Sequence, residues 1–255
     1  MCTVVILRRP EHDWPVLIAA NRDESGSRPW RPPARHWPDR EDVVAGLDEL
    51  AGGTWLGIND FGLIACVLNR PGTLGPAENK RSRGELPLEA LDHAEASAAA
   101  DALAHLAPDA YRPFNLIVAD ARDAYWVGLR ENENKIIVQP LDDGLSMITA
   151  HDLNDPTHSA RQKHHFPRFA AAKTPNPDTG DWQAWQKLLE STERAPDNEP
   201  ESAMLIETDW GFGTSSSSLI AVPSAAQRSD NPDTSTLWRF RGGKPDEADW
   251  ADVEI

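Results

Sequence analysis

The second residue of the chain, Cys2, is the first candidate for chemistry, and it leads the apolar run CTVVIL. Removal of an initiator methionine before a small residue would leave Cys2 with both a thiol and a free α-amino group. The amine has a pKa of roughly 7.7–8.0, whereas the thiol, with a pKa of roughly 8.5, is a strong nucleophile once ionised. Cys2 would then supply a nucleophile and a base together. The alternative is a buried cysteine that only opens a strand.

The tetrapeptide NRDE at 21–24 gives an apolar run an unusually polar end. The segments CTVVILRR and PVLIAANRDE, separated by EHDW, predict an N-terminal β-hairpin whose polar end lies near Cys2. In an extended strand Asn21 and Asp23 point to one face, and Arg22 and Glu24 to the other. An aspartate can hold an α-amino group, and an arginine can favour a thiolate or bind a carboxylate. The alternative is a solvated surface ion pair.

Two further polar residues follow apolar runs. Asn69 ends GLIACVLN, where its amide can stabilise an oxyanion or begin the turn NRPG. His151 follows GLSMITA and is a candidate substrate contact or acid/base group. The spacing of His151, His158, His164 and His165 matches no zinc pattern, so we predict no metal site.

Composition narrows the class of protein. The 255 residues fit one domain over 1–255, and the formal net charge of −16 disfavours binding to nucleic acid or to anionic membranes. No apolar run reaches the length of about 18 residues typical of a membrane-spanning helix, so we expect no membrane insertion. Cys2 and Cys66 make no disulfide framework, which favours the cytoplasm. We expect no resident cofactor, and the oligomeric state stays open.

Hydrophobic patterning predicts strands and helices in separate runs. GGTWLGIND and FGLIACVLN form a second hairpin, with turn residues Asn59, Asp60 and Gly62, and the Leu- and Ala-rich segment 84–106 is helical, with Pro87 near its first turn. Strands are then predicted at FNLIVAD, AYWVGLR, KIIVQPL, GLSMITA, GTSSSSLIAV and STLWRFRG, and helices at SARQKHHFPRFAAAK and DWQAWQKLLEST. This segregation favours the α+β class.

Several of these stretches, taken in order, resemble one family. They are the N-terminal MC, NRDE at 21–24, GGTWLGI at 52–58, SRGEL at 82–86, FNLIVAD at 114–120 and GFGT at 211–214. The chain resembles the NRDE family, which includes the eukaryotic transport and Golgi organisation 2 proteins. That family is similar to the cysteine N-terminal nucleophile (Ntn) hydrolases, among them bile-salt hydrolases and penicillin V acylases. The resemblance implies a four-layer αββα sandwich with antiparallel sheets.

The resemblance also implies roles for individual residues. Cys2 is the nucleophile with its own amino group as base, Asp23 orients that amine, and Asn69 stabilises the oxyanion. The residues expected to bind substrate or to support the site are Asn21, Arg22, Glu24 and His151.

The sequence departs from the hydrolase pattern at two places. An arginine three positions before the aspartate is replaced by Ala20, and Arg22, which should face away from Asp23, is not expected to replace it. Many relatives have a Ser-Asn dipeptide where this chain has Ala150 and His151. In this chain Asn154 follows three residues later. Both departures bear on whether amide hydrolysis is retained.

Two functions are therefore predicted as alternatives. The first is a hydrolase of non-peptide C–N bonds that acts on a small acylated substrate through an acyl-enzyme on Cys2. The second is a non-catalytic protein that binds or traffics haem or a lipid-like ligand on the same scaffold. The first requires removal of Met1, and the second predicts a stoichiometric complex without an acyl-enzyme.

Overall fold

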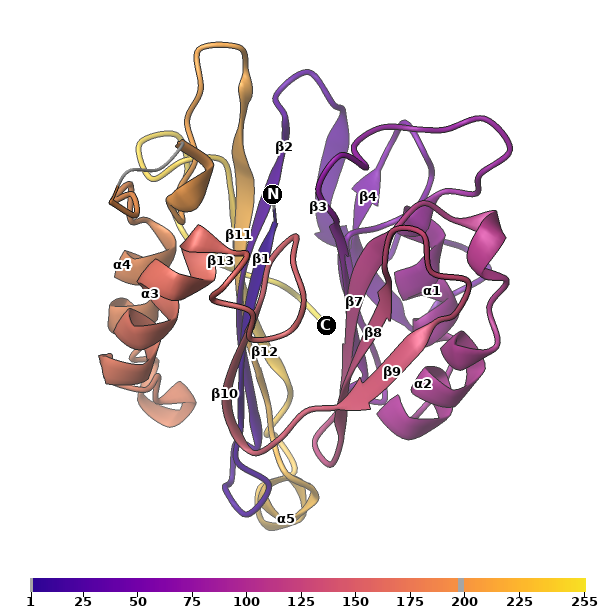
Figure 1. Cartoon of the computed structure of the whole chain (residues 1–255). Coiled ribbons are helices and arrows are strands. Elements are labelled where there is room, and N and C mark those ends of the chain that lie inside the picture. Colours follow the sequence, from indigo (N-terminus) through magenta and orange to yellow (C-terminus); the bar gives the residue numbers. More distant parts are fainter. Residues whose placement is uncertain (1, 197–199) are drawn as a thin grey trace. The chain divides into compact units, whose positions relative to one another are not determined.

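The computed structural model describes residues 2–196 and 200–255, which divide into two compact units (Figure 1). Unit 1 comprises Met1–Ser27 and Asp143–Glu254, and unit 2 comprises Arg28–Asp142 together with Ile255. Each unit contains one antiparallel sheet and its own helices, which confirms the predicted α+β class. The prediction of a single domain over 1–255 stays a prediction.

The described residues of unit 1 form a six-stranded sheet in the order β10-β1-β2-β11-β12-β13. Its strands are β1 (Thr3–Arg8), β2 (Val16–Ser25), β10 (Gly144–Ile148), β11 (Phe212–Val222), β12 (Leu237–Gly242) and β13 (Ala251–Asp252). The helices of this unit are α3 (Ala160–Ala171), α4 (Gln183–Leu189) and α5 (Ala225–Asp230), with 3-10 turns at Pro177–Thr179 and Pro200–Ser202. The predicted N-terminal hairpin is confirmed, because β1 pairs antiparallel with β2. The strand that carries the NRDE residues is thus internal to the sheet, between β1 and β11.

Helices α3 and α4 lie along one face of the unit 1 sheet (Figure 1). Val5, Leu17 and Ala19 from β1 and β2 share a buried cluster with Phe169 of α3 and Trp185 of α4. These strand residues are odd-numbered because successive side chains alternate between the two faces of a strand. The hydrophobic cluster therefore fixes which residues of β1 and β2 face the helices.

Unit 2, all of whose residues 28–142 are described, holds a seven-stranded sheet in which the strands follow one another in chain order. They are β3 (Trp30–Ala34), β4 (Val43–Asp48), β5 (Leu56–Asn59), β6 (Ile64–Asn69), β7 (Phe114–Ala119), β8 (Ala124–Leu129) and β9 (Ile137–Pro140). Its helices are α1 (Leu86–Leu91) and α2 (Ala96–Ala104), with 3-10 turns at Arg83–Glu85 and Pro108–Ala110. Pro87 lies in the first turn of α1, as predicted. Both helices contact the sheet, and their leucines share its buried cluster.

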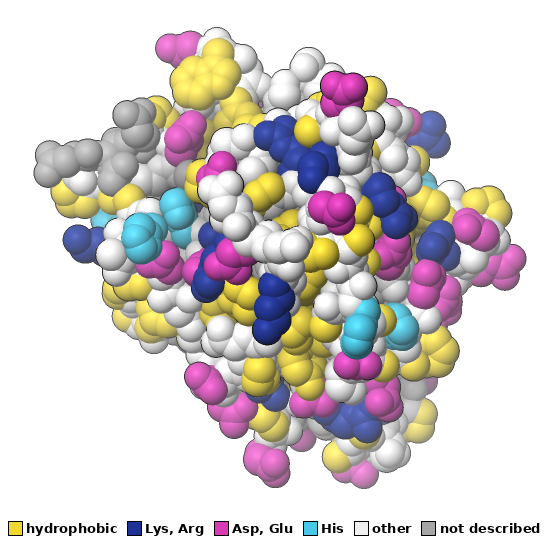
Figure 2. Space-filling model, turned by 45° about the vertical axis from the view of Figure 1, so that its right-hand side comes forward, with side chains coloured by type: hydrophobic (Ala, Val, Ile, Leu, Met, Phe, Trp, Pro, Cys, Tyr) yellow, Lys and Arg dark blue, Asp and Glu magenta, His cyan; other side chains and the backbone are white. Residues whose placement is uncertain are grey.

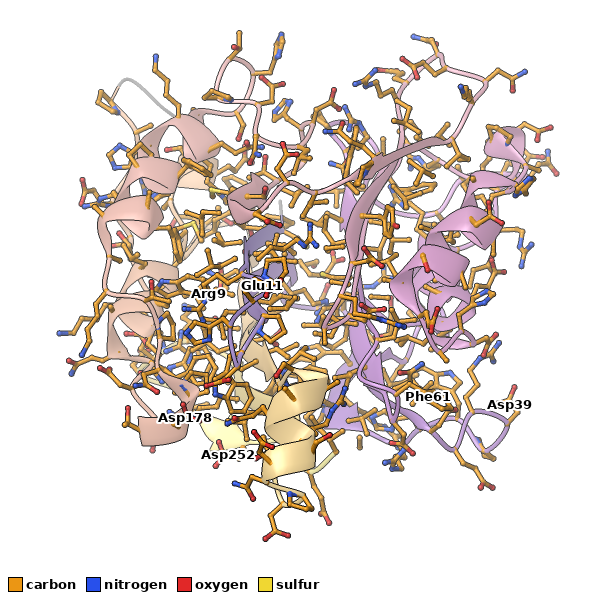
Figure 3. All side chains as sticks on the ribbon, turned by 90° about the horizontal axis from the view of Figure 1, so that it is seen from below. Arg9, Glu11, Asp39, Phe61, Asp178 and Asp252 are labelled. Atoms are coloured by element: carbon orange, nitrogen blue, oxygen red, sulfur yellow. The ribbon has the colours of Figure 1, made fainter. Side chains whose placement is uncertain are left out.

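The predicted turn between β5 and β6 is confirmed. The Asn59 side-chain oxygen accepts hydrogen bonds from the backbone N–H groups of Phe61 and Leu63, at 3.1 and 3.0 Å. Gly62 has a φ of 87°, a conformation that glycine adopts without steric cost. Phe61 is 60% exposed at the tip of this turn (Figure 3). Asn59 also donates to the carbonyls of Leu91 and His93, which ties the turn to the end of α1.

The link between β1 and β2 is anchored on Trp14. The Trp14 indole N–H donates to the Asp178 carboxylate at 2.8 Å, and Arg9 donates to the Trp14 carbonyl at 3.2 Å. Figure 3 labels Arg9 and Asp178 in this part of unit 1. These contacts hold the far end of the hairpin, away from the NRDE residues at the other end of β2.

The charged side chains do not gather by sign on the face shown in Figure 2, where acidic and basic groups are interspersed. Among the described residues, no helix is long and apolar enough to cross a membrane. Both cysteines are present as thiols.

Candidate active site

Cys2 lies one residue before β1, with 9% of its surface exposed. Thr3 pairs with Asn21 of β2, so continuing the register by one residue places Cys2 across from Arg22. The Cys2 Sγ lies 3.8 Å from the backbone carbonyl oxygen of Asp23, to which it donates a weak hydrogen bond. The hairpin therefore brings the thiol beside the NRDE residues, as the sequence predicts.

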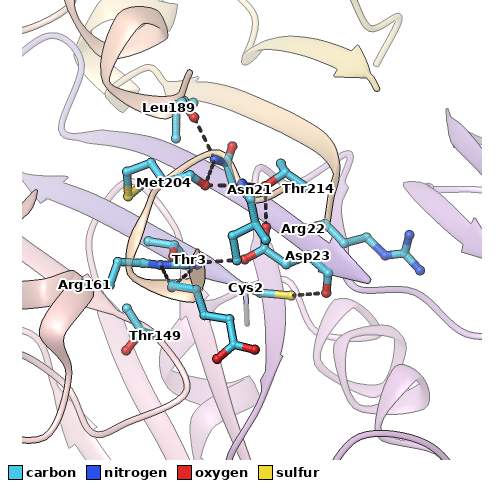
Figure 4. A network of polar contacts seen from close by, with 12 residues as sticks. Cys2, Thr3, Asn21, Arg22, Asp23, Thr149, Arg161, Leu189, Met204 and Thr214 are labelled. Atoms are coloured by element: carbon cyan, nitrogen blue, oxygen red, sulfur yellow. Dashed lines mark hydrogen bonds and ion pairs between the residues drawn. The ribbon is translucent and has the colours of Figure 1, made fainter. Parts of the chain in front are cut away.

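The NRDE residues divide between the two faces of β2. Because Leu17 and Ala19 pack toward the helices, strand alternation places Asn21 and Asp23 on that face too. Arg22 and, by the register, Cys2 belong to the opposite face. In Figure 4 Arg22 extends away from β2 on the side opposite to that from which Arg161 approaches.

Asp23 is enclosed by two donors from distant parts of unit 1 (Figure 4). Thr214 of β11 donates its hydroxyl to Asp23 Oδ1 at 2.7 Å, and Arg161 of α3 donates to Oδ2 at 2.9 Å. Both side chains of the ion pair are buried, with 2% of Arg161 and 0% of Asp23 exposed. Arg161 also donates to the Thr3 hydroxyl at 2.6 Å and makes two hydrogen bonds to the Glu201 carbonyl. A single guanidinium thus joins β1, β2, α3 and the turn at Glu201.

Asn21 is held by three hydrogen bonds on the helix face. Its amide nitrogen donates to the carbonyls of Leu189 and Met204, both at 2.9 Å, and its oxygen accepts from the Ser217 hydroxyl at 2.7 Å. Leu189 is the last residue of α4, where the carbonyl groups have no partner within the helix. Asn21 therefore ties the end of α4 and residue 204 to the sheet, which is a supporting role.

Arg22 is held by a bulge in the neighbouring strand. The register of β11 shifts between Thr214 and Ser216, and the extra residue, Ser215, accepts a hydrogen bond from Arg22 at 2.9 Å. The Ser215 hydroxyl in turn donates to the Arg22 carbonyl at 3.2 Å. Arg22 faces away from Asp23, as predicted, but it shares the face of Ala20 and is two residues further along β2. Arg22 thus carries a guanidinium on the face of Ala20, and whether it serves the site stays a prediction.

The surroundings of Cys2 disfavour its thiolate. Burial raises the pKa of the thiol, and the nearby Asp23 carboxylate raises it further, whereas Arg22 lowers it. At neutral pH the side chain is therefore a protonated thiol. A nucleophile in this state needs a base that removes its proton during attack.

Glu24 and His151 each make a local contact outside the ion pair of Asp23. Glu24 is half-buried, and its carboxylate accepts from the backbone N–H of Ser25 at 2.9 Å. His151 is half-buried and its ring stacks near that of His158, with centroids 6.5 Å apart. In the described residues, no group of three or more His, Cys, Asp or Glu side chains could hold a metal ion. Substrate binding by Glu24 or His151 stays a prediction.

The Asn154 side chain is held by local hydrogen bonds to β10. Its side-chain oxygen accepts from the Met147 backbone N–H at 2.8 Å, and its amide donates to the Ser146 hydroxyl at 3.2 Å. The backbone N–H of Asn154 donates to the Met147 carbonyl at 3.0 Å. Asn154 thus closes the end of β10 against the loop that follows it.

Asn69, the predicted oxyanion residue, belongs to unit 2, so its pairing with Cys2 stays a prediction. It ends β6, and the turn that follows is held by a chain of hydrogen bonds. Arg70 donates to Asn115 at 2.7 Å, and the Thr73 hydroxyl donates to the Arg70 carbonyl at 2.8 Å. Arg83, from the SRGEL segment, donates to the Thr73 hydroxyl at 2.6 Å and to its carbonyl at 2.7 Å. The turn after Asn69 is therefore fixed by residues whose roles the sequence did not reveal.

The GGTWLGI and SRGEL segments meet backbone to backbone. A Cβ atom placed on Gly53 would lie 2.4 Å from the carbonyl of Gly84, closer than real Cβ atoms approach. The backbone N–H of Thr54 donates to the Gly84 carbonyl at 2.8 Å. The absence of a side chain at Gly53 thus lets the first segment support the second, which carries Arg83.

Comparison with known proteins assigns the chain to a family. The family model for transport and Golgi organisation 2 matches residues 1–229. The chain belongs to the transport and Golgi organisation 2 family. The bovine transport and Golgi organization protein 2 homolog (Bos taurus) is 40% identical over 114 residues, covering 41% of this chain and 38% of that protein. The human homolog (Homo sapiens) is 34% identical over 146 residues, covering 51% of this chain and 50% of that protein. The matches thus span half or less of the length of these curated relatives.

Solved structures show the fold. An N-acylethanolamine-hydrolyzing acid amidase ortholog from Caenorhabditis elegans superposes with a TM-score of 0.57 at 15% identity, covering 92% of this chain and 98% of that one. Penicillin V acylase from Agrobacterium tumefaciens gives a TM-score of 0.54 at 15% identity, covering 99% and 86%. A variant of the conjugated bile acid hydrolase from Clostridium perfringens gives 0.51 at 12% identity, covering 98% and 92%. The predicted N-terminal nucleophile hydrolase fold is therefore confirmed.

Proposed function

We propose that this family member is a cysteine amidohydrolase that cleaves the C–N bond of a small acylated substrate. The observation that carries the proposal is the position of Cys2. Cys2 lies directly before the strand that pairs with the NRDE strand and its thiol is buried, in a fold shared with several amide-cleaving enzymes. We place the protein in a reducing compartment such as the cytoplasm, because its two cysteines make no disulfide framework.

The proposed reaction uses Cys2 after removal of Met1. The Sγ atom forms a bond to the substrate carbonyl carbon while the α-amino group of Cys2 accepts the thiol proton. Collapse of the tetrahedral intermediate breaks the C–N bond, and the same proton passes to the leaving amine. Water then attacks the thioester, releasing the carboxylic acid and restoring the thiol. The buried state of Cys2, which raises its pKa, supports a mechanism in which the base acts during attack.

The supporting residues divide into three groups under this proposal. Asp23 orients the α-amino group, since its carboxylate is fixed by two donors beside the start of β1. Asn69 donates to the oxyanion from the end of β6, where the following turn is held in place. Arg22 lies on the face of Cys2 and contacts or attracts the substrate there, with Glu24 and His151 as peripheral contacts.

The test begins with the intact mass of the purified protein, which must show that Met1 is absent. The enzyme and its Cys2→Ala variant are then assayed with a series of N-acyl-7-amino-4-methylcoumarins of increasing acyl length. We expect release of the fluorescent amine by the wild type and none by Cys2→Ala, with a thioester-linked acyl group detectable by mass on Cys2. Turnover that survives in Cys2→Ala, or a retained Met1 in active protein, would refute the mechanism.

The alternative of a haem- or lipid-binding protein on the same scaffold stays a prediction. A haem titration at micromolar protein separates it from the amidase proposal. A stoichiometric shift of the haem absorption band, without turnover of any amide in the series, would favour the alternative.

A further inference from the structure

Arg161 of α3 forms a buried ion pair with Asp23, close to Cys2. It lies in the first turn of α3, 138 residues from Asp23 in the chain, yet its guanidinium is 2.9 Å from the Asp23 carboxylate. Both partners are almost completely buried, so the ion pair is not screened by water. A buried carboxylate that lost this partner would leave an uncompensated charge, which is strongly unfavourable.

Arg161 also contacts the start of β1 and the turn at Glu201. The nitrogen that binds Asp23 also donates to the hydroxyl of Thr3, the residue directly after Cys2, at 2.6 Å. The other guanidinium nitrogens donate to the Glu201 carbonyl at 3.0 and 2.6 Å. The Glu201 carbonyl therefore holds two nitrogens of the guanidinium, Nε and Nη2. The third nitrogen, Nη1, connects Thr3 to Asp23.

We propose that Arg161 is a positioning residue for Cys2: it fixes Asp23 and Thr3 relative to each other and neutralises the carboxylate of Asp23, the residue whose backbone carbonyl contacts the thiol. The inference rests on the proposed function of Cys2 as a nucleophile. It assigns to α3 a role in the site that neither the NRDE residues nor the family match describes.

The electrostatic consequence has a definite sign. The Asp23 carboxylate disfavours the thiolate of Cys2. Arg161 carries the opposite charge 2.9 Å from that carboxylate, so by Coulomb's law it should oppose this effect. Removing only Arg161 should shift thiolate formation to higher pH, and removing only the Asp23 charge should shift it to lower pH. Removing both charges should bring the midpoint back toward that of the wild type. A purely structural role predicts no such compensation.

The test measures alkylation of Cys2 by iodoacetamide in the full-length protein between pH 6 and 10, with the labelled site read by peptide mass spectrometry. The variants are Arg161→Met, Arg161→Lys, Asp23→Asn and the double variant Asp23→Asn/Arg161→Met. We expect Arg161→Met to raise the midpoint by about one pH unit, equivalent to about tenfold slower labelling at a fixed pH below it. Arg161→Lys should shift it less, and the double variant should return it by at least half.

Two results would overturn the inference. The first is a wild-type midpoint in folded Arg161→Met. The second is that Arg161→Met and Asp23→Asn/Arg161→Met both fail to fold while Arg161→Lys folds with an unchanged midpoint. That result would assign Arg161 to stability alone. The readout is independent of hydrolysis. A protein that labels as expected but cleaves no amide would contradict the proposed function and leave the role of Arg161 in place.

Discussion

Replacing Asn21 by alanine should destabilise unit 1 without changing the thiol chemistry. The substitution removes two donated hydrogen bonds, to the carbonyls of Leu189 and Met204, and the acceptor of the Ser217 hydroxyl. An unsatisfied buried polar group costs about 1–3 kcal/mol. The Met204 carbonyl keeps only a weak, shared hydrogen bond from the Thr214 hydroxyl at 3.4 Å, because that hydroxyl donates mainly to Asp23. We therefore expect a total loss of about 2–4 kcal/mol in the free energy of unfolding.

The assay is urea and thermal unfolding followed by tryptophan fluorescence, for which Trp185 of α4 is a buried reporter. For a protein of this size the expected loss corresponds to a Tm lower by about 4–16 °C. Ser217→Ala, which removes one of the three hydrogen bonds, should cost about 1 kcal/mol. Ser25→Ala, at the exposed end of β2, is the matched control and should change little. A loss below 1 kcal/mol for Asn21→Ala, or a changed labelling midpoint of Cys2, would refute the supporting role.

Two further predictions concern single positions elsewhere. Burial, followed by the neighbouring His164, lowers the pKa of His165 to about 4, so this histidine is neutral in the folded protein. An unfolded histidine with a pKa of about 6.5 binds a proton first, so stability should fall as the pH drops from about 6.5 to 4, by a total on the order of 3 kcal/mol. His165→Phe should flatten this part of a stability–pH curve measured in urea, whereas an unchanged slope, or the same flattening in His164→Gln, would contradict the assignment. Gly53→Ala should cost about 1–3 kcal/mol or more, because its Cβ would meet the Gly84 carbonyl, and a melting temperature equal to that of the wild type would show that the two segments separate freely.

The parts of the fold that the sequence predicted are those encoded by neighbouring residues. The N-terminal hairpin and the Asn59 turn follow from alternating apolar runs and local turn chemistry, and both are confirmed. The predictions did not include β3, because its sequence WRPPA contains two prolines, which lack the N–H groups of a sheet ladder. β3 forms nonetheless, since it lies at an edge of the unit 2 sheet and pairs on one side only.

The candidate site was predictable to the same extent and for the same reason. Pairing of two adjacent strands brings Cys2 to the NRDE residues, so sequence proximity sufficed. The partners of Asp23 come from α3 and β11, and no local pattern links Arg161 or Thr214 to it. Only the occurrence of Thr214 within the GFGT segment gave a signal, and that signal came from the resemblance rather than from spacing.

The bulge at Ser215 makes the length of the serine run a determinant of the site. Thr214 and Ser217 are three residues apart, yet both bond to residues on the helix face of β2, which a regular strand with period two would not allow. The extra residue between them restores the phase. Deleting one serine from residues 215–218 would leave the composition almost unchanged but would move Thr214 to the other face of the sheet. Within this family, losing a single residue from that run should therefore disturb the contacts of Asp23 and Asn21 more than several substitutions around it would.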